Sequence, residues 1–191
     1  MRRRQARRRA FSLIEVMLVM AMIGILAAIT VPKLRFDNAR VETAARAIDL
    51  AIMAAQRDAV SRQHNVLVVF DTAARALRTV WDVNNDRTAG AGERLRTTPL
   101  SEALAFARPP GVSALGGDST SASAGVPDER GPALLLQRSG STDRAVTVYL
   151  TTTQSLRPKA AVRDVRALQV ARASGRSSWF IWNGSVWRRA Q

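Results

Sequence analysis

The sequence predicts an α+β protein, in which a long N-terminal helix packs on an antiparallel, β-sandwich-like C-terminal domain. Three observations predict this class. Residues 11–31 are almost continuously apolar, residues 32–63 show a helical hydrophobic period, and residues 64–191 contain short β-rich runs separated by turn residues. A helix followed only by strands is typical of an α+β fold. The 191 residues include no Cys, so core packing alone must hold the C-terminal domain together.

The apolar run predicts a transmembrane helix. Residues 11–31 would rise about 31 Å as a helix, which matches the hydrocarbon core of a bilayer. The ten residues before this run contain six Arg and no acidic residue. By the positive-inside rule that end lies in the cytoplasm, so the chain after Pro32 is expected on the other side of the membrane.

Glu15 is the only ionisable residue in the apolar run. A charge at the centre of a membrane helix costs about 2.5 to 3.5 kcal/mol or more. Two interpretations remain open from the residues alone. The side chain either extends to the headgroups near the cytoplasmic end of the span, or it has a cationic partner inside the membrane.

The segment Ala10-Phe-Ser-Leu-Ile-Glu15, followed by apolar residues, resembles the class III signal of type IV pilins and type II secretion pseudopilins. The resemblance implies that prepilin peptidase cuts between Ala10 and Phe11 and methylates the new N-terminus at Phe11. The family usually has Gly where this chain has Ala10, and we expect the small alanine to allow cleavage. Loss of residues 1–10 lowers the formal net charge from +14 to +8.

The same resemblance assigns roles in assembly. It implies that the Glu15 carboxylate neutralises the amine of Phe11 on a neighbouring subunit, so that two charges that are unfavourable in lipid become a pair. Gly24 and Pro32 stand where many members of the family have a Gly and a Pro that bound a helical stretch which loosens on assembly. An ordinary secretory signal is the alternative, but Leu26 replaces the small residue that its cleavage pattern needs.

Residues 32–63 predict an amphipathic helix that continues the span and is weakened at Pro32. One face should pack against a sheet. Its apolar positions are Leu34, Val41, Ile48, Ile52, Ala55 and Ala59.

Residues 64–191 predict a periplasmic domain of seven or eight antiparallel strands that form two packed sheets. Residues 109–132 are rich in Gly, Pro, Ser and Ala, which predicts a mobile surface loop. Asn183-Gly184 predicts a hairpin with a type I′ turn, because both central residues of that turn need positive φ. The β-rich segments are residues 66–70, 75–81, 95–98, 103–107, 134–138, 145–151, 165–173, 179–182 and 186–188.

Four downstream segments are similar to the H-type minor pseudopilin domain of the GspH/FimT group: residues 54–62, 66–70, 81–86 and the dipeptide Gly175-Arg176. The resemblance implies a minor pseudopilin of a type II secretion system, held in the bacterial inner membrane and incorporated near the tip of the pseudopilus. The implied partners are prepilin peptidase, other major and minor pseudopilins, the inner-membrane assembly platform and secreted cargo.

The sequence gives no indication of an enzyme or of a cofactor. His64 is the only histidine, and there is no cysteine, so neither a catalytic triad nor a zinc site is expected. Asp82, Asn84, Asp86 and Glu93 have the spacing of the oxygen ligands in a calcium loop. However, Arg87 replaces the Gly of that loop. A turn between two strands, which is rich in polar residues, accounts for the same sequence.

The C-terminal region is basic and contains three tryptophans. Phosphate neutralisation and base stacking could make it a nucleic-acid surface, and FimT-like relatives in DNA-uptake pili bind DNA through a late Gly-Arg-x-Arg element. Here Ser178 replaces the second arginine of that element. The alternative function is therefore a type IV pilus minor pilin that binds DNA through Arg176, Arg188 and Arg189. The other interpretation of this region is a solvated basic face whose tryptophans belong to the core. The basic residues after residue 156 are Arg157, Lys159, Arg163, Arg166, Arg172, Arg176, Arg188 and Arg189, against the single acid Asp164.

Overall fold

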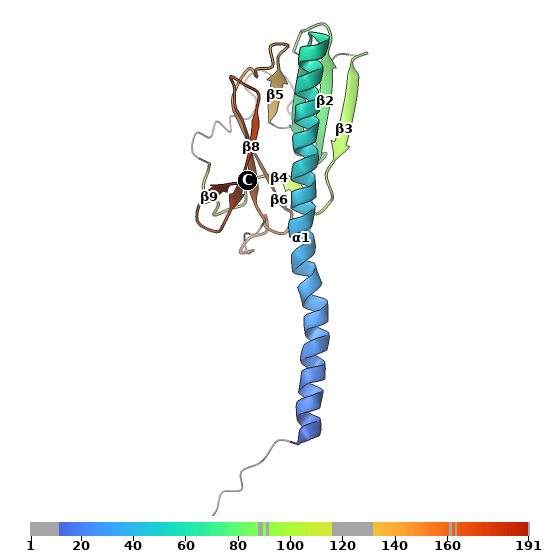
Figure 1. Ribbon diagram of the computed structural model, residues 1–191, viewed down its shortest axis with the longest axis vertical. Helices are drawn as coiled ribbons and strands as arrows, with labels where there is room; N and C mark the ends of the chain where they lie inside the picture. Colours follow the sequence, from blue (N-terminus) through green and yellow to red (C-terminus); the bar gives the residue numbers. More distant parts are fainter. Residues whose placement is uncertain are drawn as a thin grey trace, which may run out of the picture. The chain divides into compact units, whose positions relative to one another are not determined.

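The computed structural model describes residues 12–87, 90, 92–115, 132–160, 162 and 164–190, except for the side chains of residues 27–37. Within this part of the chain lie one helix and nine strands, which confirms the α+β class (Figure 1). The chain divides into two compact units, residues 1–36 and residues 37–191.

Helix α1 spans Leu13–Arg62, and its backbone stays helical through Pro32. The prediction that residues 11–31 and 32–63 form one helix is confirmed for that range. Among the residues with described side chains, no helix has both the length and the apolar character needed to cross a membrane. The span predicted over residues 11–31 extends beyond those residues and stays a prediction.

The nine strands form two antiparallel sheets. The first sheet has the order β3-β2-β1-β5 and the second the order β4-β6-β7-β8-β9. All nine predicted β segments contain a strand, although the total is above the seven or eight expected. The strands are β1 Asn65–Asp71, β2 Ala76–Asp82, β3 Arg94–Pro99, β4 Leu104–Phe106, β5 Ala133–Leu136, β6 Val146–Thr152, β7 Arg166–Val170, β8 Ser177–Trp182 and β9 Trp187–Arg189.

The second half of α1 packs on both sheets. Its buried stripe is Val41, Ala45, Ile48, Ile52, Ala55 and Ala59. These side chains share one core with inward-facing residues of the two sheets, including Val68 of β1 and Val148 of β6. Phe70 and Phe106 join the sheets across this core, with ring centroids 5.4 Å apart and an angle of 89° between the ring planes. The predicted amphipathic face is therefore confirmed, except for Leu34, whose side chain lies outside the described residues.

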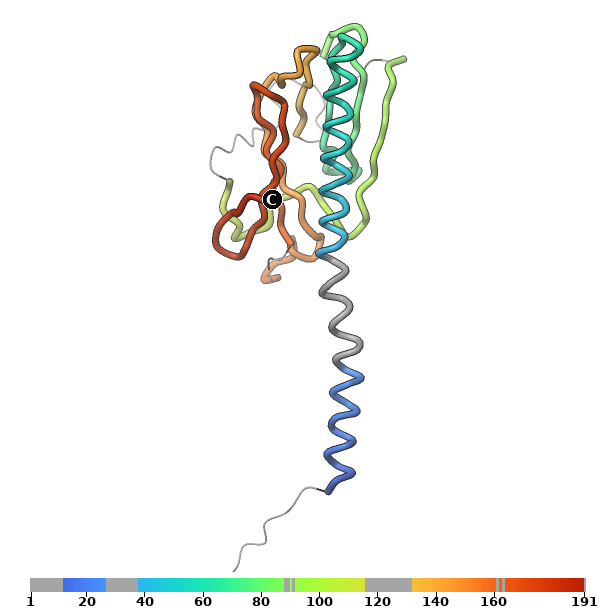
Figure 2. Tube along the Cα trace, in the orientation of Figure 1, coloured from blue at the N-terminus to red at the C-terminus, as the bar shows by residue number. Residues whose placement is uncertain are grey.

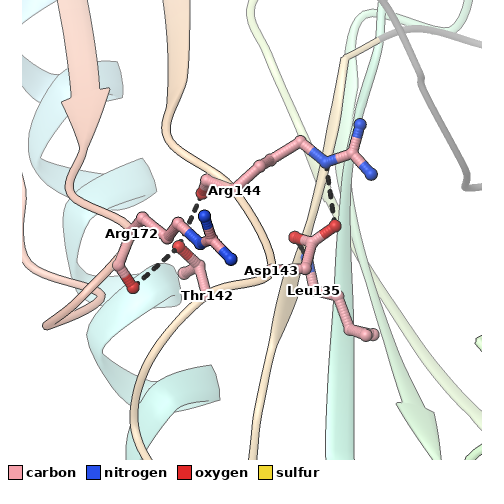
Figure 3. A network of polar contacts seen from close by, with 5 residues as sticks. All are labelled: Leu135, Thr142, Asp143, Arg144 and Arg172. Atoms are coloured by element: carbon pink, nitrogen blue, oxygen red, sulfur yellow. Dashed lines mark hydrogen bonds and ion pairs between the residues drawn. The ribbon is translucent and has the colours of Figure 1, made fainter.

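A polar network holds the two sheets together where β5 ends (Figure 3). The Thr142 hydroxyl donates to the Arg144 carbonyl (2.6 Å), and the Thr142 N–H donates to the Arg172 carbonyl beyond β7 (2.9 Å). One Asp143 carboxylate oxygen accepts the N–H of Leu135 on β5 (3.1 Å), and the other accepts a hydrogen bond from the Arg144 guanidinium (2.8 Å). The segment after β5 is thereby bonded to both sheets.

Gln56 on α1 binds two hairpin turns to the helix. Its amide nitrogen donates to the carbonyl oxygens of Gly140 (2.7 Å) and Ser174 (2.8 Å). The next residue, Gly175, has φ +63°, and a Cβ there would lie 2.6 Å from the Gly140 oxygen and 2.7 Å from the Gln56 nitrogen. Only glycine fits both the positive φ and this close approach. Gly175, which the sequence singled out by resemblance, thus has a packing role in this chain.

The C-terminal hairpin is confirmed, but its predicted turn type is wrong (Figure 2). Of Asn183 and Gly184, only Gly184 has positive φ, at +103°. The Asn183 N–H donates to the Val186 carbonyl (3.2 Å), and the Asn183 side-chain oxygen accepts the N–H of Val186 (2.9 Å). The turn is therefore not type I′, which needs positive φ at both Asn183 and Gly184.

Residues 109–115 of the predicted loop contain no helix or strand, but two of their apolar side chains are anchored in the domain. Val112 and Leu115 are buried, and Leu115 packs with Tyr149 and Ala167 on the face of the second sheet that points away from the main core. The Leu115 N–H donates to the Tyr149 hydroxyl (3.0 Å). Two apolar side chains are enough to anchor a segment whose composition otherwise resembles a loop. The rest of the predicted loop, residues 116–131, lies outside the described residues.

The close approach at Gly175 predicts that Gly175→Ala lowers the free energy of unfolding by about 2 to 4 kcal/mol, because the new Cβ is strained by φ and also crowds a backbone oxygen. Chemical denaturation of purified variants measures this loss. Gly111→Ala is the matched control: Gly111 has φ +84°, and a Cβ placed there would meet no atom within 4 Å. The control should lose about 1 to 2 kcal/mol. Equal losses for the two variants would contradict the crowding at Gly175.

Candidate functional site

Helix α1 begins next to a residue that caps it. The Ser12 hydroxyl accepts a hydrogen bond from the N–H of Ile14 (3.2 Å), and the Ser12 carbonyl accepts one from the N–H of Glu15 (3.0 Å). A serine before a helix in this way satisfies a backbone N–H that has no partner within the first turn. The pattern Ser-x-x-Glu predicts this role for Ser12, which the family resemblance did not bring out.

Glu15 lies in the first turn of α1 with its side chain exposed. A negative charge there is favoured by the positive end of the helix dipole. Among the described residues, its carboxylate has no hydrogen bond or ion pair. The predicted partner, the amine of Phe11, lies outside the described residues, as does Ala10, so the predicted cleavage and the charge pair stay predictions.

The rest of this segment is exposed and apolar. Every side chain from residue 12 to residue 26 is exposed, and eleven of them are large and apolar. An apolar surface of this extent marks a site of contact with other proteins or with a membrane. The eleven residues are Leu13, Ile14, Val16, Met17, Leu18, Val19, Met20, Met22, Ile23, Ile25 and Leu26.

Gly24 lies within this apolar segment in helical conformation, and a Cβ placed there would meet no atom within 4 Å. Nothing within the described chain therefore requires a glycine at this position. The side chain of Pro32 lies outside the described residues. The roles in assembly that the resemblance implies for Gly24 and Pro32 stay predictions.

The three arginines proposed for nucleic-acid contact are exposed and lie on different segments. Arg176 precedes β8, and Arg188 and Arg189 lie on β9 opposite Ile181 and Phe180. Phe180 is four residues beyond Arg176, or about 13 Å along a strand. Arg188 and Arg189 are adjacent on a strand, so their side chains point to opposite faces.

Arg166 is not part of a solvated basic face. It is 8% exposed, and its guanidinium forms an ion pair with Glu42 on α1 (2.5 Å). Glu42 also pairs with Arg46 (3.1 Å), and the Ser177 hydroxyl on β8 donates to Asp49 (2.5 Å). These side chains line a cleft of about 350 Å³ between α1 and β8. The ion pair therefore joins the helix to the second sheet.

The C-terminal tryptophans use their rings for packing. Trp179 packs against the main core. The Trp187 ring lies 5.7 Å from the Tyr149 ring and 5.3 Å from the Trp182 ring between centroids, and its N–H donates to the Ser113 carbonyl (2.9 Å). This arrangement favours the structural interpretation of the tryptophans over that of stacking platforms for bases.

The acidic loop after β2 is organised by its own backbone. The two carboxylate oxygens of the buried Asp82 accept the N–H groups of Asp86 and Arg87, each at 3.0 Å, and the Asn84 amide donates to the Asp86 carboxylate (2.8 Å). Burial raises the pKa of the Asp82 carboxyl, and the hydrogen bonds from Arg87 and Asp86 oppose that rise. Asp82 therefore acts as an acceptor that shapes the turn.

Glu93 has a similar role in the same loop. Its carboxylate oxygens accept the N–H of Val83 (3.1 Å) and the N–H of Gly90 (2.8 Å). In the described part of the chain, no group of three or more His, Cys, Asp or Glu side chains is placed to hold a metal ion. The geometry favours the polar-turn interpretation of these residues over the calcium alternative.

His64 lies between α1 and β1 and is half-buried. Its Nδ1 is 3.3 Å from the carbonyl oxygen of Asn65. This contact fits the structural role expected for the single histidine of the sequence.

Comparisons with known proteins identify the N-terminal segment. Residues 5–31 match the family model of the prokaryotic N-terminal methylation motif, which confirms the resemblance to type IV pilin-like proteins in this segment. No curated protein matches the chain significantly. Among solved structures, the chain is similar to the minor pseudopilin EpsH from the Type 2 Secretion System of Vibrio cholerae, with 13% identity and a TM-score of 0.43 over 79% of this chain and 96% of that chain.

Proposed function

We propose that this chain is a minor pseudopilin of a type II secretion system, a subunit that works by assembly and not by catalysis. The observation that carries the proposal is the N-terminal segment. Residues 5–31 match the methylation motif, and Glu15 at the start of α1 stands among exposed apolar side chains with no ion-pair partner in the described chain. A carboxylate in this setting suits a subunit that pairs with a copy or a homologue of itself.

The proposed precursor is a single-pass protein of the bacterial inner membrane, anchored by residues 11–31. Its N-terminus lies in the cytoplasm and its β domain in the periplasm. Prepilin peptidase cuts between Ala10 and Phe11, which removes the six arginines of the leader, and methylates Phe11. The new amine would stand directly before Ser12, the residue that caps α1.

The proposed assembly step follows from the charges at the helix start. A cationic amine before the Ser12 cap lies at the positive end of the helix dipole, which is unfavourable. The Glu15 carboxylate of a neighbouring subunit neutralises it, and the exposed side chains of residues 13–26 pack against the neighbour's helix. In this proposal Gly24 and Pro32 weaken the helix where it must loosen during assembly.

The type II assignment rests on the H-type resemblance of the β domain. Gln56 and Gly175 both belong to the segments that show this resemblance, and they lie in contact at the turn before β8. The proposed partners are the other major and minor pseudopilins and the inner-membrane assembly platform. We place the subunit near the pseudopilus tip, where its β domain faces neighbouring minor pseudopilins and secreted cargo.

The charge pair predicts that Glu15→Leu blocks incorporation into filaments without blocking cleavage of the leader. Loss of one partner of a buried pair costs about 3 to 5 kcal/mol, so the assembled fraction should fall by at least about tenfold. The measurement compares the amount of the mature chain in sheared filaments with the amount in the membrane fraction.

Two matched variants separate charge from shape at this position. Glu15→Gln keeps the shape and should fail like Glu15→Leu, whereas Glu15→Asp keeps the charge and should restore part of the assembly. Normal incorporation of Glu15→Leu into filaments would refute the pairing. Absence of the unmutated chain from sheared filaments would instead favour a simple membrane-anchored protein.

The alternative function is a type IV pilus minor pilin that binds DNA. The observation in its favour is that Arg176, Arg188 and Arg189 are all exposed. It predicts salt-sensitive retardation of DNA by the detergent-solubilised chain, lost when all three arginines are replaced by alanine. We expect no retardation at low salt, because Arg188 and Arg189 point to opposite faces of β9.

A further inference from the structure

Strand β3 is one edge strand of the first sheet (Figure 1). It pairs with β2 along all six of its residues, Arg94–Pro99, and no described strand pairs with its other side. Five of the six residues are exposed. An edge strand of this kind presents a row of backbone N–H and C=O groups that can pair with another extended chain.

On the face of the first sheet that packs on the main core, strand β3 carries two positive charges. Arg94 lies opposite Trp81 and Arg96 opposite Thr79, so the two arginines are on the same side of the sheet. The Arg94 guanidinium lies 4.6 Å from the centre of the Trp81 ring, which holds it in place by a cation–π contact. Two positive charges therefore recur at the two-residue period of a strand.

The opposite side of β3 is apolar at its centre. Leu95 lies opposite Val80, which belongs to a buried cluster with Leu67, Val69 and Leu135. Val80 is 3% exposed, whereas Leu95 is 48% exposed. The apolar face of the first sheet thus continues to its edge and remains uncovered there among the described residues.

The charge and the exposed leucine of β3 determine which kind of extended segment can pair with it. A second copy of β3, paired in parallel or with residue 94 opposite residue 96, would place arginine opposite arginine, and like charges across strands are destabilising. An extended segment with acidic residues at every second position would place carboxylates beside Arg94 and Arg96 and its other side chains beside Leu95. Backbone pairing would supply affinity and the alternating side chains specificity, as in recognition by β-strand addition.

We propose that β3 is a docking strand for an extended, acidic segment of a partner protein, which adds to the first sheet as a further strand. The proposal goes beyond the assembly role of α1. It rests on the β domain alone and holds whether or not Phe11 is processed.

The test uses the full-length chain in detergent and a labelled, capped peptide in which Glu and Val alternate. Fluorescence anisotropy measures binding, and hydrogen–deuterium exchange with mass spectrometry locates it. We expect binding and slower exchange in the segment from residue 94 to residue 99. Arg96→Glu should weaken binding by about tenfold, because one attractive cross-strand pair becomes repulsive. A peptide in which Lys replaces Glu should not bind.

Two further variants keep the test decisive. Arg96→Thr removes the charge but retains a strand-forming residue, so it should also weaken binding if Arg96→Glu does not fold. Arg188→Glu makes the same charge change on β9, an edge strand of the other sheet, and should leave binding unchanged. The proposal is overturned if the acidic peptide does not bind, if exchange in β3 does not slow, or if Arg188→Glu weakens binding as much as Arg96→Glu.

Discussion

The structure depends on how the apolar side chains of α1 are removed from water. Between Val41 and Ala59 one stripe of the helix is buried under two sheets, with the charged residues on the other faces. Between Leu13 and Leu26 every side chain is exposed and the apolar residues surround the helix. The first pattern completes a core within the chain. The second requires lipid or other chains, since exposed apolar surface of this size is unfavourable in water.

The charged residues in these two parts of α1 find their partners in different ways. Arg166 on β7 and the partly exposed Glu42 on α1 form an ion pair that joins the helix to the second sheet. Glu15 has no such partner among the described residues. In the proposed filament the amine of Phe11 on the next subunit takes that place. The same physical rule, that charges on an apolar surface need a partner, thus accounts for both sites.

The helix and the strands could be predicted from the sequence because they depend on local hydrophobic periods. The run 66–70 and the stripe through Ile48 and Ile52 have the periods of a buried strand and of an amphipathic helix. Contacts between distant residues have no such signal. The bonds from Gln56 to two turns, the burial of Leu115 under Tyr149, and the Arg166 ion pair each join segments more than 30 residues apart.

The candidate site could be predicted only in part. The pattern from Ala10 to Glu15 predicts the methylation motif that residues 5–31 match, and the Ser-x-x-Glu spacing is a signal for the cap at Ser12. Arg188 and Arg189 are adjacent in the sequence, but as neighbours on β9 they point to opposite faces. The composition of the basic C-terminus could not show this, because register is set by hairpin geometry.

The proposed function requires that the leader is removed and that the apolar helix is then covered by neighbouring subunits. The most direct measurement is the intact mass of the protein purified from the membranes of its native host. We expect a polypeptide that begins at Phe11 and carries one methyl group. A polypeptide that still begins at Met1, or that begins well beyond Phe11, would contradict the proposed function.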